Sequence, residues 1–216
     1  MSLDPRRTRT LSHHPYQKGA IAYWMNREMR LKDNWALLAA QDWAIREQVA
    51  LKIAYNLDPG FLGGGRRQFT FKLDALKEIF TDCQKKGISF SLMIGSKTEV
   101  DLIKWVKKEQ IGGLVTDFAP LRLQRKWLKT VVNAIEIPVI EVDAHNIVPC
   151  WIASEKPEYG AYTLRPKINK MLKEFLVEYP ALKKHPISTS SSTINWSALE
   201  KSFNGKEIAP VTWIKA

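Results

Sequence analysis

The chain has 216 residues, of which 45% are hydrophobic and 25% are charged, and its formal net charge is +11. These are the proportions of a globular protein, and they exclude a disordered tail, a collagenous fibre and a coiled coil. No uninterrupted apolar run approaches the ~20 residues that span a bilayer, and the first twenty residues lack the apolar stretch of a signal peptide. The positive charge is spread along the chain, which favours weak association with polyanions and does not mark a nucleic-acid recognition patch.

Cysteine and histidine are too few and too scattered to indicate a metal or disulfide site. The two cysteines, Cys83 and Cys150, lie far apart and form no CxxC pair, which argues against a disulfide scaffold and a thiolate metal site. The four histidines have no acidic or thiol partner at ligand spacing. We therefore expect no metal, and a reduced, cytoplasmic setting.

The predicted elements alternate between strand and helix from residue 20 onward, after a basic flexible arm over residues 1–19. Short apolar runs predict strands over residues 20–24, 49–57, 88–94, 113–116 and 138–142. Apolar residues at helical spacing predict a helix after each of the first four strands, the second of them over residues 72–86. Asp33 is placed to cap the first helix, Gly87 to end the second, and Pro120 to open the fourth.

This alternation predicts an α/β fold over residues 20–150. Nearly continuous apolar strands are typical of a parallel sheet buried on both faces. We expect a doubly wound, five-stranded, mostly parallel Rossmann-like sheet with helices on both faces.

Residues 151–216 read as a helical and irregular segment. One more amphipathic helix ends before Pro180, and a serine-rich run over residues 188–193 breaks the periodicity. Trp196 and Trp213 follow without a core of their own. We expect this tail to pack on the sheet domain or on a domain absent from the chain.

Ligands of doubly wound sheets bind beyond the carboxyl ends of the strands. The glycines at 63–65 follow the second strand and lack dinucleotide-binding spacing, so a flexible loop is a better interpretation than a phosphate cradle or a dehydrogenase fingerprint. No nucleophile elbow is present. Asp117 and Asp143 each end a strand, where they either bind a ligand or cap a loop.

Several motifs resemble the photolyase and cryptochrome family, and more narrowly the class II cyclobutane pyrimidine dimer photolyases. The first βα junction, YWMNREMRLKDN from Tyr23 to Asn34, is similar to that of the family. The most specific stretch is EVDAHNIVPCWIASEKPEYGAYTLRPKI, from Glu141 to Ile168. Further matches are DFAPLR from Asp117, NWALLAAQ from Asn34, the arginines at 66 and 67, and the His-Pro pair at 185. The chain departs from the class at Tyr162, where the family usually has arginine.

The resemblance implies a light-driven DNA repair enzyme, of which this chain forms one part. Members of the family are about twice as long and carry a helical carboxyl-terminal domain that holds FAD and the lesion pocket. By resemblance, residues 20–150 are the antenna domain, and residues 151–216 are a connector towards the flavin domain. No catalytic residue is then expected in this chain, which alone is inactive. The expected partner is a helical flavin domain; DNA is the partner of the full-length family, and its binding to this chain is expected to be weak or absent.

The same resemblance implies that the α/β domain holds an antenna pigment, a deazaflavin or a folate. A planar pigment needs a flat apolar slot with a few polar anchors. The strand ends supply the candidates, with Arg27 and Asp117 expected as anchors and Met25, Met93 and Phe118 as walls; the full set is Trp24, Met25, Arg27, Met93, Gly95, Asp117, Phe118, Asp143 and Asn146. The alternative for each residue is packing at a domain interface.

Two other functions stay open at this point. The chain could be a free-standing module that binds a pigment or a nucleotide without catalysis. It could also be a docking subunit for a separate helical domain, which the tryptophans of the tail favour.

Overall fold

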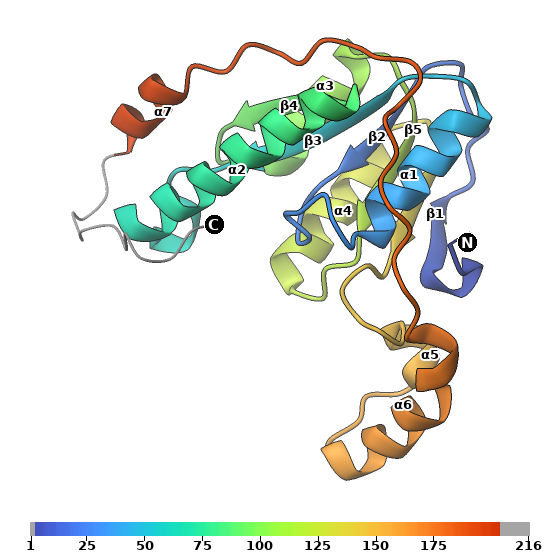
Figure 1. Ribbon diagram of the computed structural model, residues 1–216. Coiled ribbons are helices and arrows are strands. Elements are labelled where there is room, and N and C mark those ends of the chain that lie inside the picture. Colours follow the sequence, from blue (N-terminus) through green and yellow to red (C-terminus); the bar gives the residue numbers. More distant parts are fainter. Residues whose placement is uncertain (1–2, 204–216) are drawn as a thin grey trace.

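The computed structural model describes residues 3–203, and its centre is a six-stranded sheet (Figure 1). The strand order is β1-β6-β5-β2-β3-β4, and all neighbours are parallel except β1, which runs antiparallel to β6. The strands are β1 (Thr8–Ser12), β2 (Ala20–Trp24), β3 (Leu51–Leu57), β4 (Ser89–Ile94), β5 (Ile111–Asp117) and β6 (Val139–Val142). The mostly parallel α/β sheet predicted from the alternation is confirmed.

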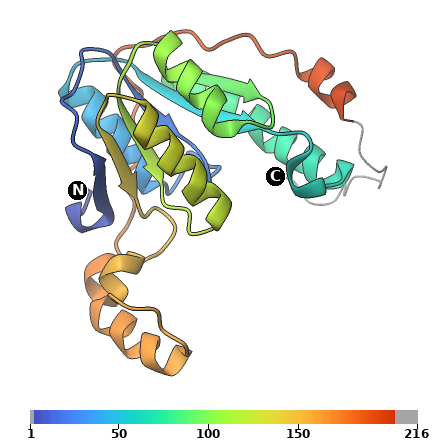
Figure 2. The same cartoon turned by 180° about the vertical axis from the view of Figure 1, so that it is seen from behind.

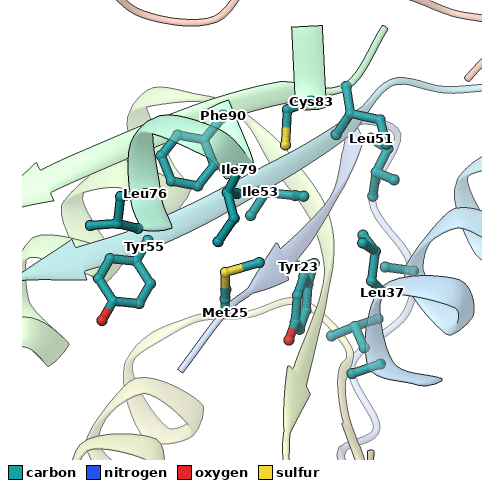
Figure 3. Packing of buried hydrophobic residues seen from close by; sticks show 14 of the residues in the cluster. Tyr23, Met25, Leu37, Leu51, Ile53, Tyr55, Leu76, Ile79, Cys83 and Phe90 are labelled. Atoms are coloured by element: carbon teal, nitrogen blue, oxygen red, sulfur yellow. The ribbon is translucent and has the colours of Figure 1, made fainter. Parts of the chain in front are cut away.

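Helices cover both faces of the sheet, as the doubly wound prediction requires (Figures 1 and 2). One face packs against α1 (Trp35–Arg46) and α2 (Arg66–Lys86), and the other packs against α3 (Thr98–Lys108) and α4 (Arg122–Ala134). Strand β2 shows the alternation directly, because Tyr23 lies in the first cluster and Trp24 in the second. Figure 3 shows the first of these layers, in which side chains of β2, β3 and β4 meet those of α2.

The amino-terminal segment corrects two predictions, the flexible arm and the count of five strands. Residues Pro5–Arg7 form a short 3-10 helix, η1, and Thr8–Ser12 form the sixth strand at the edge beside β6. The strand was missed because its sequence, TRTLS, is polar and has a single large apolar residue. Its pairing is stabilised instead by a salt bridge from Arg9 to the buried Glu141 opposite it.

Of the three residues predicted to mark a helix end, Gly87, Asp33 and Pro120, the structure confirms Gly87. Gly87 adopts the left-handed conformation (φ 69°) after α2, as predicted for a glycine that ends a helix. Asp33 was expected to cap α1, but it has a positive φ of 51°, and the side chain of Asn34 accepts the amide hydrogens of Ala36 and Leu37. Pro120 was expected at the first turn of α4, but that helix begins two residues later, after Leu121.

The segment after β6 forms two parts. Helices α5 (Cys150–Ala153) and α6 (Ala161–Phe175) share a small apolar cluster and extend away from the sheet (Figure 1). The chain then passes back over α1 and reaches α7 (Trp196–Ser202), which contacts α2.

Contacts along this return path support packing of the tail on the sheet domain. The amide of Gln41 in α1 binds both backbone groups of Lys183, at 2.9 and 3.0 Å. Trp196 packs edge-to-face on Phe80 with ring centroids 5.7 Å apart, so its apolar surface is used within the domain. Trp213, the other tryptophan expected to seek a partner, lies outside the described residues.

Candidate functional site

A cavity of about 320 Å³ opens beyond the carboxyl ends of β2 and β3. The chain runs from β2 outward to β3 and β4 and then returns to β5 on the other side of β2, so the strand order reverses here. This reversal is where doubly wound sheets bind ligands. The lining residues come from strand ends, loops and three helices: Trp24, Met25, Asn26, Arg27, Met29, Tyr55, Asn56, Asp58, Phe61, Lys72, Thr98, Gln124 and Trp127.

Aromatic side chains form much of the wall. Trp24 and Tyr55 are buried at the ends of β2 and β3. Phe61, in the short 3-10 helix η2 (Phe61–Gly63), and Trp127 of α4 face each other with ring centroids 6.1 Å apart. These rings offer flat apolar surfaces to a planar ligand.

Two residues that line the cavity have an amide oxygen without a hydrogen-bond partner among residues 3–203. Asn56 donates through its amide nitrogen to the carbonyl of Gly95 (2.9 Å) and to the hydroxyl of Thr98 (3.0 Å). Within the described part of the chain this leaves its Oδ1 unpaired, as is Oε1 of Gln124. Buried acceptors without a donor are costly, and both oxygens lie beneath the accessible surface of the cavity wall.

The charge of the lining is positive, with Arg27 and Lys72 against Asp58. Within residues 3–203, the Lys72 ammonium has no hydrogen bond or salt bridge, and it lies 5.5 Å from the centroid of the Phe61 ring. Burial lowers the pKa of Lys72, and the charge of Asp58 opposes that shift. The cavity therefore favours an anionic ligand.

Asp117, expected as a ligand anchor, organises the loop after β2 and does not line the cavity. Its buried carboxylate accepts the backbone amide hydrogens of Asn26, Arg27 and Glu28 and the hydroxyl hydrogen of Tyr23. Burial raises the pKa of Asp117, and the backbone hydrogen bonds act in the opposite direction. Hydrogen bonds within the protein occupy the oxygens of Asp117. Asp117 would therefore affect a ligand by holding this loop in place.

Asp143 and Asn146 form a loop of their own after β6. Asp143 is fully buried and accepts the backbone amide hydrogens of His145, Asn146 and Cys150, together with the Asn146 side-chain amide. This is the loop-capping alternative weighed from the sequence. Neither residue lines the cavity.

Three further candidates do not line the cavity. Phe118 packs against Trp151 at the β1–β6 side of the sheet, with ring centroids 5.5 Å apart. Met93 packs in the cluster beneath α3 and α4, and Gly95 contributes only the carbonyl that holds Asn56. Of the nine candidates, the structure brings Trp24, Met25 and Arg27 to the cavity.

Sequence reasoning missed most of the polar lining. Asn56 is a polar residue within a mostly apolar strand. Lys72 and Gln124 lie in amphipathic helices, in which polar residues are normally expected on the side exposed to solvent. A possible signal was a polar side chain one residue before a strand's carboxyl end, as at Asn56 in β3. The lysine and the glutamine carried no such signal.

A larger hollow of about 820 Å³ lies at the opposite edge, around the amino ends of β2 and β5. Several of its polar groups are already paired: Lys52 forms a salt bridge with Glu109 at 2.7 Å, and Gln17 donates to the carbonyl of Glu136 at 2.7 Å. It lies at the amino ends of the strands, whereas doubly wound sheets bind their ligands at the carboxyl ends. We therefore take the smaller cavity as the candidate site.

Among residues 3–203, no group of three or more histidine, cysteine, aspartate or glutamate side chains could hold a metal ion. Over the same residues, no helix combines the length and apolar character needed to cross a bilayer.

Comparison with known proteins identifies the family. A DNA photolyase profile matches residues 21–186. The chain is 39% identical over 220 residues to a deoxyribodipyrimidine photo-lyase of Potorous tridactylus, covering 98% of this chain and 41% of the relative. It is 36% identical to a deoxyribodipyrimidine photo-lyase of Arabidopsis thaliana, covering 99% of this chain and 45% of the relative.

A solved structure supports the same fold. It is an archaeal photolyase from Sulfolobus tokodaii, described as holding two FAD molecules and as implying a novel light-harvesting cofactor, with a TM-score of 0.59. It is 14% identical in sequence, and the match covers 87% of this chain and 42% of that one. This chain thus spans less than half the length of these relatives, and it belongs to the DNA photolyase family.

Proposed function

We propose that this chain is the light-harvesting α/β part of a class II deoxyribodipyrimidine photolyase, which splits cyclobutane pyrimidine dimers in DNA under light. The observation that carries the proposal is the cavity at the reversal of strand order, with aromatic walls and an excess of positive charge in its lining. The class II assignment rests on the stretch from Glu141 to Ile168. Residues 20–150 are the antenna domain and residues 151–216 the connector.

The residues of the cavity fit one fused, planar ring system of a pigment. A volume of about 320 Å³ is at the lower end of ligand pockets. We place the FAD and the dimer-splitting step outside residues 3–203, so this chain alone is inactive in repair.

Within this proposal the chain binds, orients and shields a pigment, a deazaflavin or a folate, which absorbs light when bound. Trp24, Phe61 and Trp127 supply the flat surfaces. Met25 and Met29 complete the apolar wall and help to exclude water. Fixing the ring plane matters because energy transfer to another pigment depends on their relative orientation.

The test is binding of deazaflavin and methenyltetrahydrofolate to the purified chain, followed by absorbance and fluorescence. One pigment should bind in a one-to-one ratio, and Met29→Trp, which fills the cavity, should abolish that binding. Leu176→Trp is the matched control, because Leu176 is 61% exposed and far from the cavity lining. If neither pigment binds the folded chain, or if Met29→Trp binds as well as the wild type, the antenna proposal is wrong.

Of the two tail tryptophans behind the docking-subunit alternative, Trp196 packs within the chain, and Trp213 lies outside the described residues. Trp196 packs on Phe80, and Phe203 stacks on Phe69 with ring centroids 4.7 Å apart. These aromatic side chains already have partners within the chain. The nucleotide-binding alternative uses the same cavity and is tested by adding FMN and ATP to the same titrations.

A further inference from the structure

The exposed side of α4 carries a row of cations that does not line the cavity. Arg122, Lys126 and Lys129 are spaced four and three residues apart, so they lie on one side of the helix, and all three are exposed. The buried residues of α4, Leu128 and Val131, pack on the sheet. The three cations, here called the α4 row, therefore face solvent over about 10 Å of helix length.

The charges of the α4 row are not neutralised by the described part of the chain. Helix α4 contains no acidic residue, and its fourth cation, Arg125, pairs with the buried Glu141. Within residues 3–203, the charged groups of the α4 row form no salt bridge or side-chain hydrogen bond. On the opposite face of the sheet, Lys85 of α2 pairs with Asp82 at 2.8 Å, which is how an ordinary solvated helix balances its charges.

Helix stability does not explain the α4 row. Cations stabilise the carboxyl end of a helix, whereas the amino end favours anions. Arg122 is the first residue of α4, and the last turn of this helix has no basic residue. Arg122 and Lys126, four residues apart, also repel each other. The row therefore costs the isolated helix free energy, as expected for charges that serve an external partner.

Helix α3 extends the positive surface sideways. The two helices contact each other on one face of the sheet (Figure 2), and α3 adds the exposed Lys104, Lys107 and Lys108. Its acidic residues, Glu99 and Asp101, lie in its first turn, so its later turns carry only positive charge. Each helix thus contributes three exposed cations to one surface.

The composition of this surface favours a phosphate backbone over a membrane or a protein partner. Membrane-bound helices bury large apolar side chains, and protein interfaces centre on apolar or aromatic anchors. The large exposed apolar residues of this layer, Val100, Leu121 and Leu123, all lie at the start of a helix, away from most of the lysines. Lysine and arginine along a helix, without such anchors, are typical of contacts with nucleic-acid phosphates.

We propose that the α4 row, together with Lys104, Lys107 and Lys108, contacts the phosphate backbone of undamaged duplex DNA. The contact is electrostatic and does not depend on base sequence, on a lesion or on a bound pigment. It is therefore independent of the antenna proposal. The even spread of charge along the sequence did not indicate this surface, because the row forms only when α4 buries its other side.

The experiment measures binding of the full chain to a fluorescent, undamaged duplex of about 20 base pairs by anisotropy, from about 50 to about 200 mM salt. The logarithm of the affinity should fall linearly with the logarithm of the salt concentration. The triple variant Arg122→Gln, Lys126→Gln and Lys129→Gln removes three phosphate contacts. It should make the slope shallower by about 2.7 and weaken binding at the lowest salt by at least about tenfold.

A control of equal charge separates this surface from the net charge of the chain. The triple variant Lys156→Gln, Lys170→Gln and Lys173→Gln removes three exposed cations from the segment around α6. It should keep the slope of the wild type. Circular dichroism confirms that both variants are folded.

The outcomes that overturn the proposal are specific. The proposal is wrong if the wild type does not bind the duplex at about 50 mM salt, or if the control variant loses as much affinity as the α4 variant. Binding to phosphatidylserine vesicles without binding to the duplex would identify a membrane surface instead. The α4 variant should still bind a pigment as the wild type does, so a failure here is distinguishable from a failure of the antenna proposal.

Discussion

The hydroxyl of Tyr23 on β2 donates to the carboxylate of Asp117 on β5 across a distance of 3.0 Å, and both side chains are buried. The same carboxylate accepts three consecutive backbone amide hydrogens of the loop after β2. This loop supplies Asn26 and Arg27 to the cavity. The end of β5 therefore positions part of a site in which Asp117 itself takes no part.

Asp117→Asn should destabilise the fold by about 1–3 kcal/mol, because one acceptor oxygen becomes an amide group facing backbone donors. Tyr23→Phe removes the hydrogen bond to the carboxylate and the one that the hydroxyl accepts from the Asn34 amide, and it should cost about 1–3 kcal/mol. Urea unfolding followed by circular dichroism measures both. Equal stability of Asp117→Asn and the wild type would show that the carboxylate does not hold the loop.

Gly113→Ala should destabilise the sheet domain by about 1–3 kcal/mol through overpacking. A Cβ atom at Gly113 in β5 would lie 2.4 Å from Cη2 of Trp43, which packs on the strand from α1. Gly60→Ala is the control, since its Cβ would lie 3.6 Å from the nearest atom, Oδ1 of Asp58. The same unfolding experiment applies, and a loss as large for Gly60→Ala would show that the contact with Trp43 is not the cause.

Gln41→Leu should detach the chain segment around Lys183 from helix α1. The substitution removes both hydrogen bonds to the backbone of Lys183, while the exposed Lys183 and Lys184 are trypsin sites. Limited trypsin digestion should cut there several-fold faster than in the wild type. Gln84→Ala, at an exposed position of α2, should leave the cleavage rate unchanged.

Glu158 should titrate at unusually low pH. A hydrogen bond from Lys167, with a further one from the Ser154 hydroxyl, lowers the pKa of Glu158 from 4.5 to about 2. Because the folded-state pKa is depressed, the contribution of this carboxylate to stability is present above pH 4.5 and is lost as the pH falls through about 2.

NMR titration of the carboxyl carbon measures that pKa directly. Lys167→Met should return the pKa of Glu158 towards 4.5. Lys173→Met, an exposed lysine on the same helix α6, should leave it low. An ordinary pKa in the wild type would mean that Lys167 and Glu158 are not paired in solution.

The central elements were predictable because their signals are local. Strand β2 occupies the predicted residues 20–24, and Gly87 ends α2 as its type requires. Strand β1 was not predictable in this way, since its polar sequence becomes a strand only when β6 offers an open edge. Likewise Asp33 and Asn34 are both common caps, and the backbone conformation of the turn decided between them.

The α/β alternation, the burial of the central strands and the resemblance to photolyases could be predicted from the amino-acid order, because periodicity and motifs are properties of neighbouring residues. Which strand ends form a site depends on how distant segments pack together. Asn56, Lys72 and Gln124 come from a strand and two helices that are distant in sequence, and the reversal of strand order brings them to one cavity. Folding also determines that the carboxylates of Asp117 and Asp143 accept hydrogen bonds from backbone amides of nearby loops. Whether a buried carboxylate has hydrogen-bond donors depends on the groups that folding places around it.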